Sequence, residues 1–301
     1  MNNDDIDVLL KRLHLANARR VWHDLLAKAE TEQWSYRDLL ATLIAEEVAH
    51  RQGTRLVRET RRAGFPFLKT IDEFDFTFQS SLRLAMLGSY LAPDFVTEGR
   101  SLVFLGPPGR GKTHLAVAIA YRAIQNGFHA RFVTCAALIE ELSREAGKGR
   151  LRHALAGYVQ PDVLVIDEVG YLAYGPDAAN VLYHLVNARH LKKRAIVLTT
   201  NKHPKTWGSV LHDTDLAEAI VDRILERGRI VRLDGPSLRT RHVATELVDS
   251  ELRPAAFSGT NPQEFPERSY VEGQLHWSGA VQVPPLRQLG SQTGVWQRGP
   301  E

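Results

Sequence analysis

Apolar residues recur at helical intervals in the N-terminal part of the chain. Between residues 6 and 29 the recurring positions are Leu9, Leu10, Leu13, Val21, Leu25 and Leu26. Steps of three and four residues place such side chains on one face, which predicts an amphipathic helix. Ser35 and Asp38 then resemble a capping box, so we predict that a second helix begins there and ends at Gly64.

From Ser101 the pattern changes to short apolar runs, separated by segments long enough for a helix. The runs that we predict to be strands are Leu102–Leu105, Arg131–Thr134, Val163–Ile166, Ile196–Thr199 and Ile230–Leu233. Strands with this spacing are typical of parallel pairing with crossover helices. The predicted fold is therefore α/β, with a five-stranded parallel sheet flanked by helices and a small all-helical domain before it.

These patterns divide the chain into four segments. We predict a helical domain over residues 1–75, a linker with a short helix over residues 76–100 and an α/β domain over residues 101–250. Residues 251–301 are rich in Pro, Gly, Ser and Gln and lack periodicity, so we expect a flexible tail.

Composition narrows the cellular setting. A single cysteine, Cys135, excludes an internal disulfide and a cysteine-based metal site, and it is typical of a reducing compartment. The first ten residues are acidic rather than basic, and no apolar run approaches the roughly 18 residues of a membrane helix. We therefore expect a cytoplasmic protein with no membrane partner. The net charge of +3 is too small to identify a partner, so the placement of charge matters more.

The segment Gly106–Thr113, GPPGRGKT, has the spacing of a phosphate-binding loop between a predicted strand and a predicted helix. Backbone N–H groups of such a loop contact phosphates, and the helix N-terminus adds a favourable dipole. We expect Lys112 to contact the β- and γ-phosphates and the Thr113 hydroxyl to bind Mg²⁺. The residues predicted to bind the nucleotide are Gly106, Pro107, Pro108, Gly109, Arg110, Gly111, Lys112, Thr113 and His114.

Two acids and an amide follow later strands of the same predicted sheet. Asp167 and Glu168 come directly after one buried strand, and Asn201 ends the next. Because these strand ends lie beside the phosphate loop, we expect Asp167 to hold Mg²⁺ and Glu168 to deprotonate a water aimed at the γ-phosphate. Asn201 suits a sensor of that phosphate. A small-molecule kinase has no need of the second carboxylate, so the acid pair favours hydrolysis.

An arginine on a later helix is a candidate for contact between subunits. Helical spacing places Arg223 outside the apolar side of its helix. An exposed arginine near a subunit edge is able to insert into a neighbouring site and stabilise charge on the transferring phosphoryl group. Arg227 and Arg229 are competing candidates, and an ordinary solvated arginine is the alternative.

Arginines line one face of the predicted helix that ends at Gly64. The residues concerned are Arg51, Arg55, Arg58 and Arg62, with Arg61 beside them. Guanidinium groups fit phosphate geometry, and a one-sided basic stripe is typical of nucleic-acid binding, whereas a solvated helix face is the alternative. No base-recognition motif is recognisable, so we expect duplex DNA binding that is largely independent of sequence and sensitive to salt.

Five sequence blocks together resemble the IstB transposition helpers, which are AAA+ ATPases related to the helicase loader DnaC and the initiator DnaA. The blocks are GPPGRGKTHLA, VLVIDEVGYL, IVLTTN, WGSVLHDTDLAEAIVDR and GPSLR, and the resemblance extends from Leu10 to Val243. The phosphate loop is common to many P-loop proteins, whereas the tryptophan-containing block is more specific. The sequence departs from the pattern at His190 and Lys192–Lys193, where a Tyr and a Gly are expected.

The resemblance implies an ATP-dependent helper that forms homo-oligomers on duplex DNA and assists a DDE-type transposase in target capture, with ATP and Mg²⁺ as cofactors. It implies that Lys112 and Glu168 take part in ATP hydrolysis. It also implies that Asn201 is the first sensor, that Arg223 is an arginine finger acting in trans and that Arg239 faces the nucleotide or an interface. The alternatives are a DnaC-like helicase loader that acts through a protein partner and a small-molecule P-loop kinase.

Overall fold

A computed structural model describes residues 3–79, 81–171 and 174–238. Arg239 and the segment predicted to be a tail lie outside these residues. None of the helices in the described ranges combines the length and the apolar composition that crossing a lipid bilayer requires.

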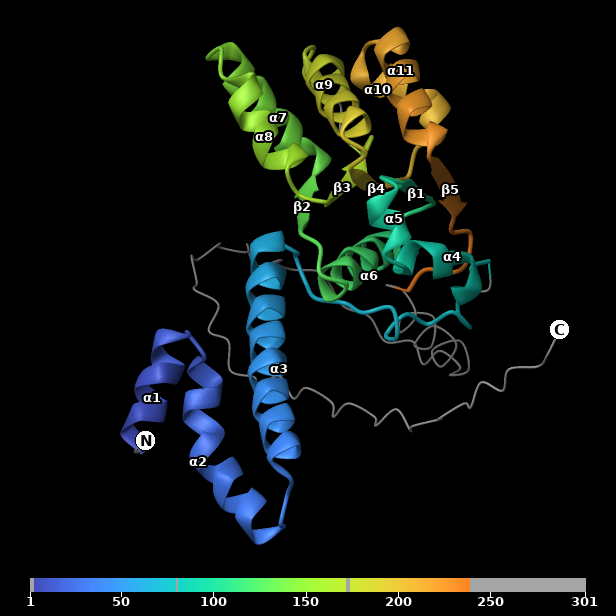
Figure 1. Ribbon diagram of the computed structural model, residues 1–301. Helices are drawn as coiled ribbons and strands as arrows, with labels where there is room; N and C mark the ends of the chain where they lie inside the picture. The colour runs from blue at the N-terminus through green and yellow to red at the C-terminus, as the bar shows by residue number, and fades with distance from the viewer. Residues whose placement is uncertain (1–2, 80, 172–173, 239–301) are drawn as a thin grey trace, which may run out of the picture. The chain divides into compact units, whose positions relative to one another are not determined.

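Five parallel strands form one sheet. They are β1 (Ser101–Leu105), β2 (Ala130–Thr134), β3 (Val163–Val169), β4 (Ala195–Thr200) and β5 (Gly228–Arg232). Their order is β2-β3-β4-β1-β5, so β1 lies between β4 and β5. This arrangement confirms the predicted α/β fold, and each predicted strand overlaps an observed one (Figure 1).

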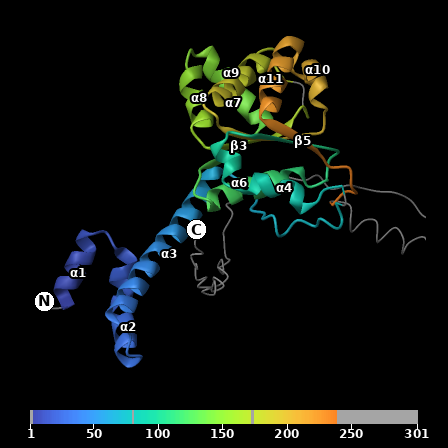
Figure 2. The same ribbon diagram turned by 45° about the vertical axis from the view of Figure 1, so that its right-hand side comes forward.

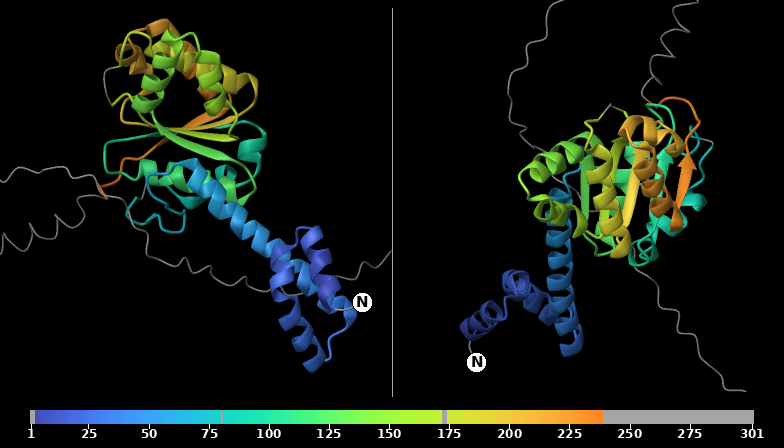
Figure 3. Two further views of the ribbon diagram at one scale, coloured as in Figure 1. Left: turned by 90° about the vertical axis from the view of Figure 1, so that its left-hand side faces the viewer. Right: turned by 90° about the horizontal axis from the view of Figure 1, so that it is seen from above.

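Helices cover both faces of the sheet. One face carries α4 (Leu84–Leu91), α5 (Asp94–Thr97) and α6 (Lys112–Gln125) (Figures 1 and 2). The other carries α7 (Cys135–Gly147), α8 (Leu151–Val159), α9 (Ala178–Leu191), α10 (Trp207–Leu211) and α11 (Thr214–Glu226). The left view of Figure 3 shows the sheet between these two layers.

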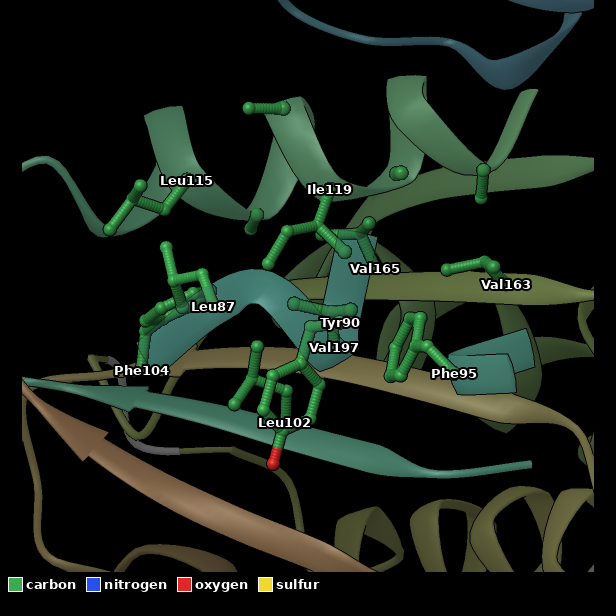
Figure 4. Packing of buried hydrophobic residues seen from close by; sticks show 14 of the residues in the cluster. Leu87, Tyr90, Phe95, Leu102, Phe104, Leu115, Ile119, Val163, Val165 and Val197 are labelled. Carbon is green, nitrogen blue, oxygen red and sulfur yellow. The ribbon is translucent and has the colours of Figure 1, made fainter. Parts of the chain in front are cut away.

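The two faces of the sheet bury separate apolar clusters, because successive side chains of a strand point to opposite sides. In β3, Val163 and Val165 join the cluster on the side of α6, whereas Leu164 and Ile166 join the cluster on the side of α7–α11. Figure 4 shows the first cluster, in which side chains of α4, α5 and α6 meet those of β1, β3 and β4. Burial on both faces explains why β3 begins with four consecutive apolar residues.

The N-terminal region contains three helices rather than two. They are α1 (Asn3–Arg12), α2 (Ala16–Thr31) and α3 (Tyr36–Ala63). The single helix predicted over residues 6–29 is wrong because the chain changes direction after α1, where His14 adopts φ +57°. This turn allows Leu10 to cluster with Ala18 and Trp22. In one continuous helix Leu10 and Trp22 would be separated by about 18 Å.

Helix α3 begins and ends as predicted. The Ser35 hydroxyl accepts a hydrogen bond from the Asp38 N–H at 3.2 Å, and Gly64 closes the helix at φ +70°. The C-terminal part of α3 contacts β2 and α6. There a guanidinium N–H of Arg55 donates to the carbonyl of Gly127, just after α6.

The segment after α3 packs into the core of the α/β domain. Ile71 and Phe74 are buried in the same cluster as Leu115 of α6. Both residues precede residue 75, the predicted end of the helical domain, so apolar packing extends across that boundary. The division of the chain into domains stays a prediction.

Arg189 of α9 is fully buried where β3 and β4 begin. Its guanidinium donates hydrogen bonds of 2.5–3.2 Å to the backbone carbonyls of Tyr158, Pro161, Asp162 and Ala195. Burial lowers the pKa of this arginine to about 9, so the side chain remains charged at neutral pH. Arg189 thereby joins the backbones of α8, β4 and the segment that leads into β3.

Replacing Arg189 with Leu should lower the free energy of unfolding by about 3 kcal/mol or more, because buried carbonyl groups lose their donor. Denaturant unfolding measures this change. Arg152→Leu, at an exposed position of α8, is the matched control and should stay within about 0.5 kcal/mol of the parent protein. Equal stability of the two variants would contradict the assigned role of Arg189.

Candidate active site

The phosphate loop connects β1 to α6, and backbone constraints hold both of its ends. The Gly106 N–H donates to the Thr200 carbonyl at 3.1 Å, which places the start of the loop beside β4. Gly111 precedes α6 with φ +84°, in the left-handed region that favours glycine. A Cβ at Gly111 would lie 2.7 Å from the ring of Phe74, so conformation and packing both require glycine there.

Lys112 is buried although it carries a charge. Its exposed fraction is 6%. The ammonium donates to the Pro107 carbonyl at 2.8 Å and lies 5.8 Å from the centroid of the Tyr171 ring. The first N–H groups of α6 have no partner within the helix. Together with Lys112 they are donors for an anion such as a nucleotide phosphate.

A cleft of about 310 Å³ lies over the loop. Its lining residues are Phe67, Lys69, Pro108, Gly109, Gly111, Lys112, Thr113, His114, Glu168, Tyr171, Thr199 and Leu238. The cleft therefore brings Glu168 together with most of the loop, as the motifs predict. Phe67 and Lys69 come from the segment after α3, and Leu238 from the segment after β5. Sequence reasoning missed these three because no motif or spacing marks them.

Asp167 of β3 is buried beside the phosphate loop, with an exposed fraction of 5%. The Thr113 hydroxyl lies 3.1 Å from both carboxylate oxygens, and the Thr199 hydroxyl donates to Oδ1 at 2.5 Å. A carboxylate removed from water is stabilised by a cation. Magnesium prefers oxygen ligands and usually combines one or two carboxylates with substrate phosphates. Asp167 and Thr113 therefore fit the predicted Mg²⁺ site.

Glu168 lies at the edge of the same cleft with a strained backbone. Its φ is +60°, a conformation that costs a non-glycine residue about 1–2 kcal/mol. A strained backbone of this kind persists only where surrounding contacts hold it in place, and it occurs most often at functional sites. The Glu168 side chain is exposed, so its carboxylate has access to the water that hydrolysis consumes.

Asn201 and His114 have different surroundings. Asn201 follows β4, and its side-chain oxygen is buried without a hydrogen-bond partner among the described residues. A buried acceptor of this kind is expected where a ligand or water binds. His114 instead bonds to the protein, since its Nε2 lies 2.8 Å from the Thr70 carbonyl and its ring packs edge-on against Phe74. Burial lowers the pKa of His114, which keeps the ring neutral at pH 7.

Arg223 is half-buried rather than fully exposed on α11, and its role as an arginine finger stays a prediction. Its Nε donates to Asn187 at 2.9 Å, and a second N–H donates to the Tyr183 hydroxyl at 3.0 Å. The guanidinium also lies 4.8 Å from the centroid of the Tyr183 ring. Helical spacing excludes Arg223 from the apolar side, but it does not reveal that α9 packs beside it. Arg229 of β5 is exposed.

The five arginines predicted to bind DNA do not share one environment. Arg51 pairs with Glu47 at 2.7 Å and Arg55 bonds to the backbone after α6. Three others border a hollow on the surface of α3, namely Arg58, Arg61 and Arg62. Arg51 and Arg55 donate to the backbone carbonyls of His14 and Gly127, which lie outside α3. Arg58, Arg61 and Arg62 are exposed near the end of α3, where Arg58 pairs with the neighbouring Glu59 at 3.1 Å.

Comparison with known proteins identifies the family. The profile described as "IstB-like ATP binding protein" matches residues 8–245. The ATP-binding protein of insertion sequence IS5376 from Geobacillus stearothermophilus is 37% identical over 230 residues, which cover 76% of this chain and 91% of that protein. Its counterpart in IS232 from Bacillus thuringiensis subsp. berliner is 33% identical over 232 residues, which cover 77% and 92%. The chain belongs to this family, so the predicted AAA+ P-loop ATPase class and ATP as its nucleotide are confirmed.

The sequence identity to solved structures is lower than the identity to these relatives. The DnaC helicase loader aligns with a TM-score of 0.44 and 22% identity, over 58% of this chain and 98% of its own. AMPPCP-bound DnaA from Aquifex aeolicus aligns with a TM-score of 0.45 and 19% identity, over 62% and 56%. The family assignment therefore rests on the sequence matches.

Replacing Gly111 with Ala should weaken ATP binding roughly tenfold or more, because strain of 1–3 kcal/mol would displace the loop. Titration with a fluorescent ATP analogue measures the affinity. Gly147→Ala is the matched control, since a Cβ at that glycine meets no atom within 4 Å. If both variants bind ATP as the parent protein does, the close contact between Gly111 and Phe74 does not shape the site.

Proposed function

We propose that this IstB-like protein is an ATP-dependent transposition helper that forms homo-oligomers on duplex DNA, hydrolyses ATP and assists a DDE-type transposase in target capture. The observation that carries the proposal is the cleft in which Lys112, Thr113 and Glu168 meet beside the buried Asp167. The relatives from Geobacillus and Bacillus are ATP-binding proteins of insertion sequences, which supports a role in transposition.

In the proposed reaction, the phosphates of ATP replace the Pro107 carbonyl as the partner of the Lys112 ammonium. Thr113 and Asp167 would hold Mg²⁺, which would offset negative charge on the phosphates of ATP. Glu168 accepts a proton from the water that attacks the γ-phosphorus, while the bond to the β-phosphate oxygen breaks and ADP leaves. The unpartnered oxygen of Asn201 supports a role in orienting that water.

A neighbouring copy of the chain supplies an arginine to the γ-phosphate in this proposal. Arg223 is the candidate from the family pattern, and it must exchange its hydrogen bonds with Asn187 and Tyr183 to reach another subunit. An arginine from a neighbouring subunit would stabilise the negative charge on the phosphoryl group while it is transferred. Arg229 stays the competing candidate because its side chain is exposed.

The proposed DNA surface is the end of α3 that carries Arg58, Arg61 and Arg62. All three side chains are exposed, and they border one hollow. Guanidinium groups bind phosphate oxygens without reading bases, so affinity should depend on salt more than on sequence. Arg51 and Arg55 contribute less in this proposal because each already donates to a backbone carbonyl outside α3.

The second candidate function is a helicase loader that acts through a protein partner. One observation favours it. The exposed large apolar side chains on α3 include Tyr36, Leu40, Ile44 and Val48. They follow one another at four-residue steps, so they form one apolar stripe on the helix. Exposed apolar stripes are typical of protein interaction sites.

Replacing Glu168 with Gln should lower kcat for ATP hydrolysis by about 100-fold or more, because a general base contributes 10²–10⁴-fold. ATP binding should persist, since the amide has nearly the shape of the acid. Phosphate release measures turnover, and nucleotide titration measures binding. Glu140→Gln, at an exposed position of α7, is the matched control. Full turnover by the Glu168 variant would show that another group is the base.

Replacing Arg61 and Arg62 with Glu should abolish duplex DNA binding at physiological salt while ATP binding persists. Loss of two phosphate contacts should also reduce the dependence of log affinity on log salt concentration by about two. Fluorescence anisotropy measures the affinity with ATP, with ADP and without nucleotide. The control is Arg144→Glu with Arg152→Glu, which makes the same charge change on α7 and α8.

The same titrations separate the two candidate functions. A transposition helper should bind duplex DNA tightly only with ATP, and the Arg61 and Arg62 variant should lose that binding. DNA binding that is absent, or equal in all nucleotide states, would favour the loader acting through a protein. If the α3 double variant and the α7–α8 control lose DNA affinity equally, overall charge rather than the α3 surface determines binding.

A further inference from the structure

The pairing between β3 and β4 changes register at the acid pair. Ile166 stands opposite Leu198, and the next recorded pair is Val169 with Thr200. Two residues of β3, Asp167 and Glu168, therefore face a single residue of β4, which is a β-bulge. Glycine is the usual residue in the left-handed position of a bulge, yet Glu168 occupies it with φ +60°. Specific contacts must hold this backbone in place.

Thr199 is the β4 residue opposite the bulge, and its hydroxyl bonds to both acids. It donates to Asp167 Oδ1 at 2.5 Å and accepts from the Glu168 N–H at 2.9 Å. Thr199 is 1% exposed, so its hydroxyl is largely shielded from water that would compete for these bonds. One hydroxyl thus fixes the Asp167 carboxylate relative to the Glu168 backbone.

Tyr174 holds the other side of the same turn. Its hydroxyl accepts from the Gly170 N–H at 3.1 Å and donates to the Glu168 carbonyl at 3.3 Å. Burial raises the pKa of the Tyr174 phenol, so the hydroxyl keeps the proton that it donates. The two hydroxyls together satisfy both the N–H and the carbonyl of Glu168.

We propose that Thr199 and Tyr174 are positioning residues for ATP hydrolysis, which hold Glu168 in its left-handed conformation so that the carboxylate faces the cleft. This inference rests on the proposed function, in which Glu168 is the general base. Neither residue needs to touch the reacting atoms. Their effect passes through the backbone of Glu168, and for Thr199 also through Asp167.

The test removes single hydroxyl groups from the full-length protein. Tyr174→Phe and Thr199→Val should each lower kcat for ATP by about 10- to 100-fold, as expected when a catalytic group moves by about 1 Å. KM for ATP should stay unchanged for Tyr174→Phe, because the Tyr174 hydroxyl bonds to the backbone of Glu168 and Gly170 rather than to the phosphate loop. Thr199→Ser retains the hydroxyl and should restore most of kcat.

Tyr158→Phe is the matched control. Its hydroxyl also has a hydrogen-bond partner in the fold, Glu141, and it lies in the layer formed by α7 and α8, away from the acid pair. This variant should keep the parent kcat. A loss of kcat in Tyr158→Phe equal to that in Tyr174→Phe would mean that removing any hydrogen-bonded phenol hydroxyl harms turnover, and it would overturn the proposal.

A double-mutant cycle with Glu168→Gln tests whether Tyr174 acts through Glu168. If it does, Tyr174→Phe should not lower the residual turnover of Glu168→Gln any further. Additive losses in the double variant would overturn the proposal. So would parent kcat in both Tyr174→Phe and Thr199→Val. Should Thr199→Val fail to fold, Tyr174→Phe and the cycle decide alone.

The outcomes also distinguish this inference from the proposed function. Parent turnover in Glu168→Gln would refute the assigned base and, with it, the inference. Loss of turnover in Glu168→Gln with parent kcat in both hydroxyl variants would leave the proposed function intact and refute only the positioning roles.

Discussion

The buried carboxylate of Asp167 is the interaction on which the candidate site depends. It bonds to Thr113 at the start of α6 and to Thr199 of β4, so three elements that are distant in sequence share one charged group. In a low-dielectric interior such bonds are strong, and leaving any partner unpaired is costly. Strand order makes this contact possible, because β1 and β3 both flank β4 and their ends converge beside the phosphate loop.

A second constraint connects the phosphate loop to the arginine-bearing helix. The segment after α3 places Phe74 against Gly111 and the Thr70 carbonyl against His114. Arg55 adds a bond from α3 to the backbone after α6. A nucleotide at the loop and DNA on α3 would therefore act on the two ends of one packed segment. This packing offers a physical explanation for the proposed dependence of DNA binding on ATP.

Some parts of the candidate site could be predicted from the sequence. In these parts, functional side chains and a characteristic backbone pattern occur together in one short stretch. The phosphate loop combines glycines, a lysine and a threonine between a strand and a helix, and the acid pair follows an apolar run. Arg55 and Arg223 illustrate the limit of such predictions. Helical spacing predicts which side of a helix is polar, but it does not predict which element packs beside that side. Both side chains form hydrogen bonds to other elements.

The strands, the caps of α3 and the phosphate loop could be predicted from local sequence, because apolar periodicity and left-handed glycines are local properties. The tertiary structure alone decided the break after α1, the lining of the cleft by the segment after α3, and the contacts of Thr199 and Tyr174 with Glu168. The contacts of Thr199 and Tyr174 depend on strand order and on a one-residue change of register between β3 and β4. Register is a relation between distant segments, so no pattern within either segment specifies it.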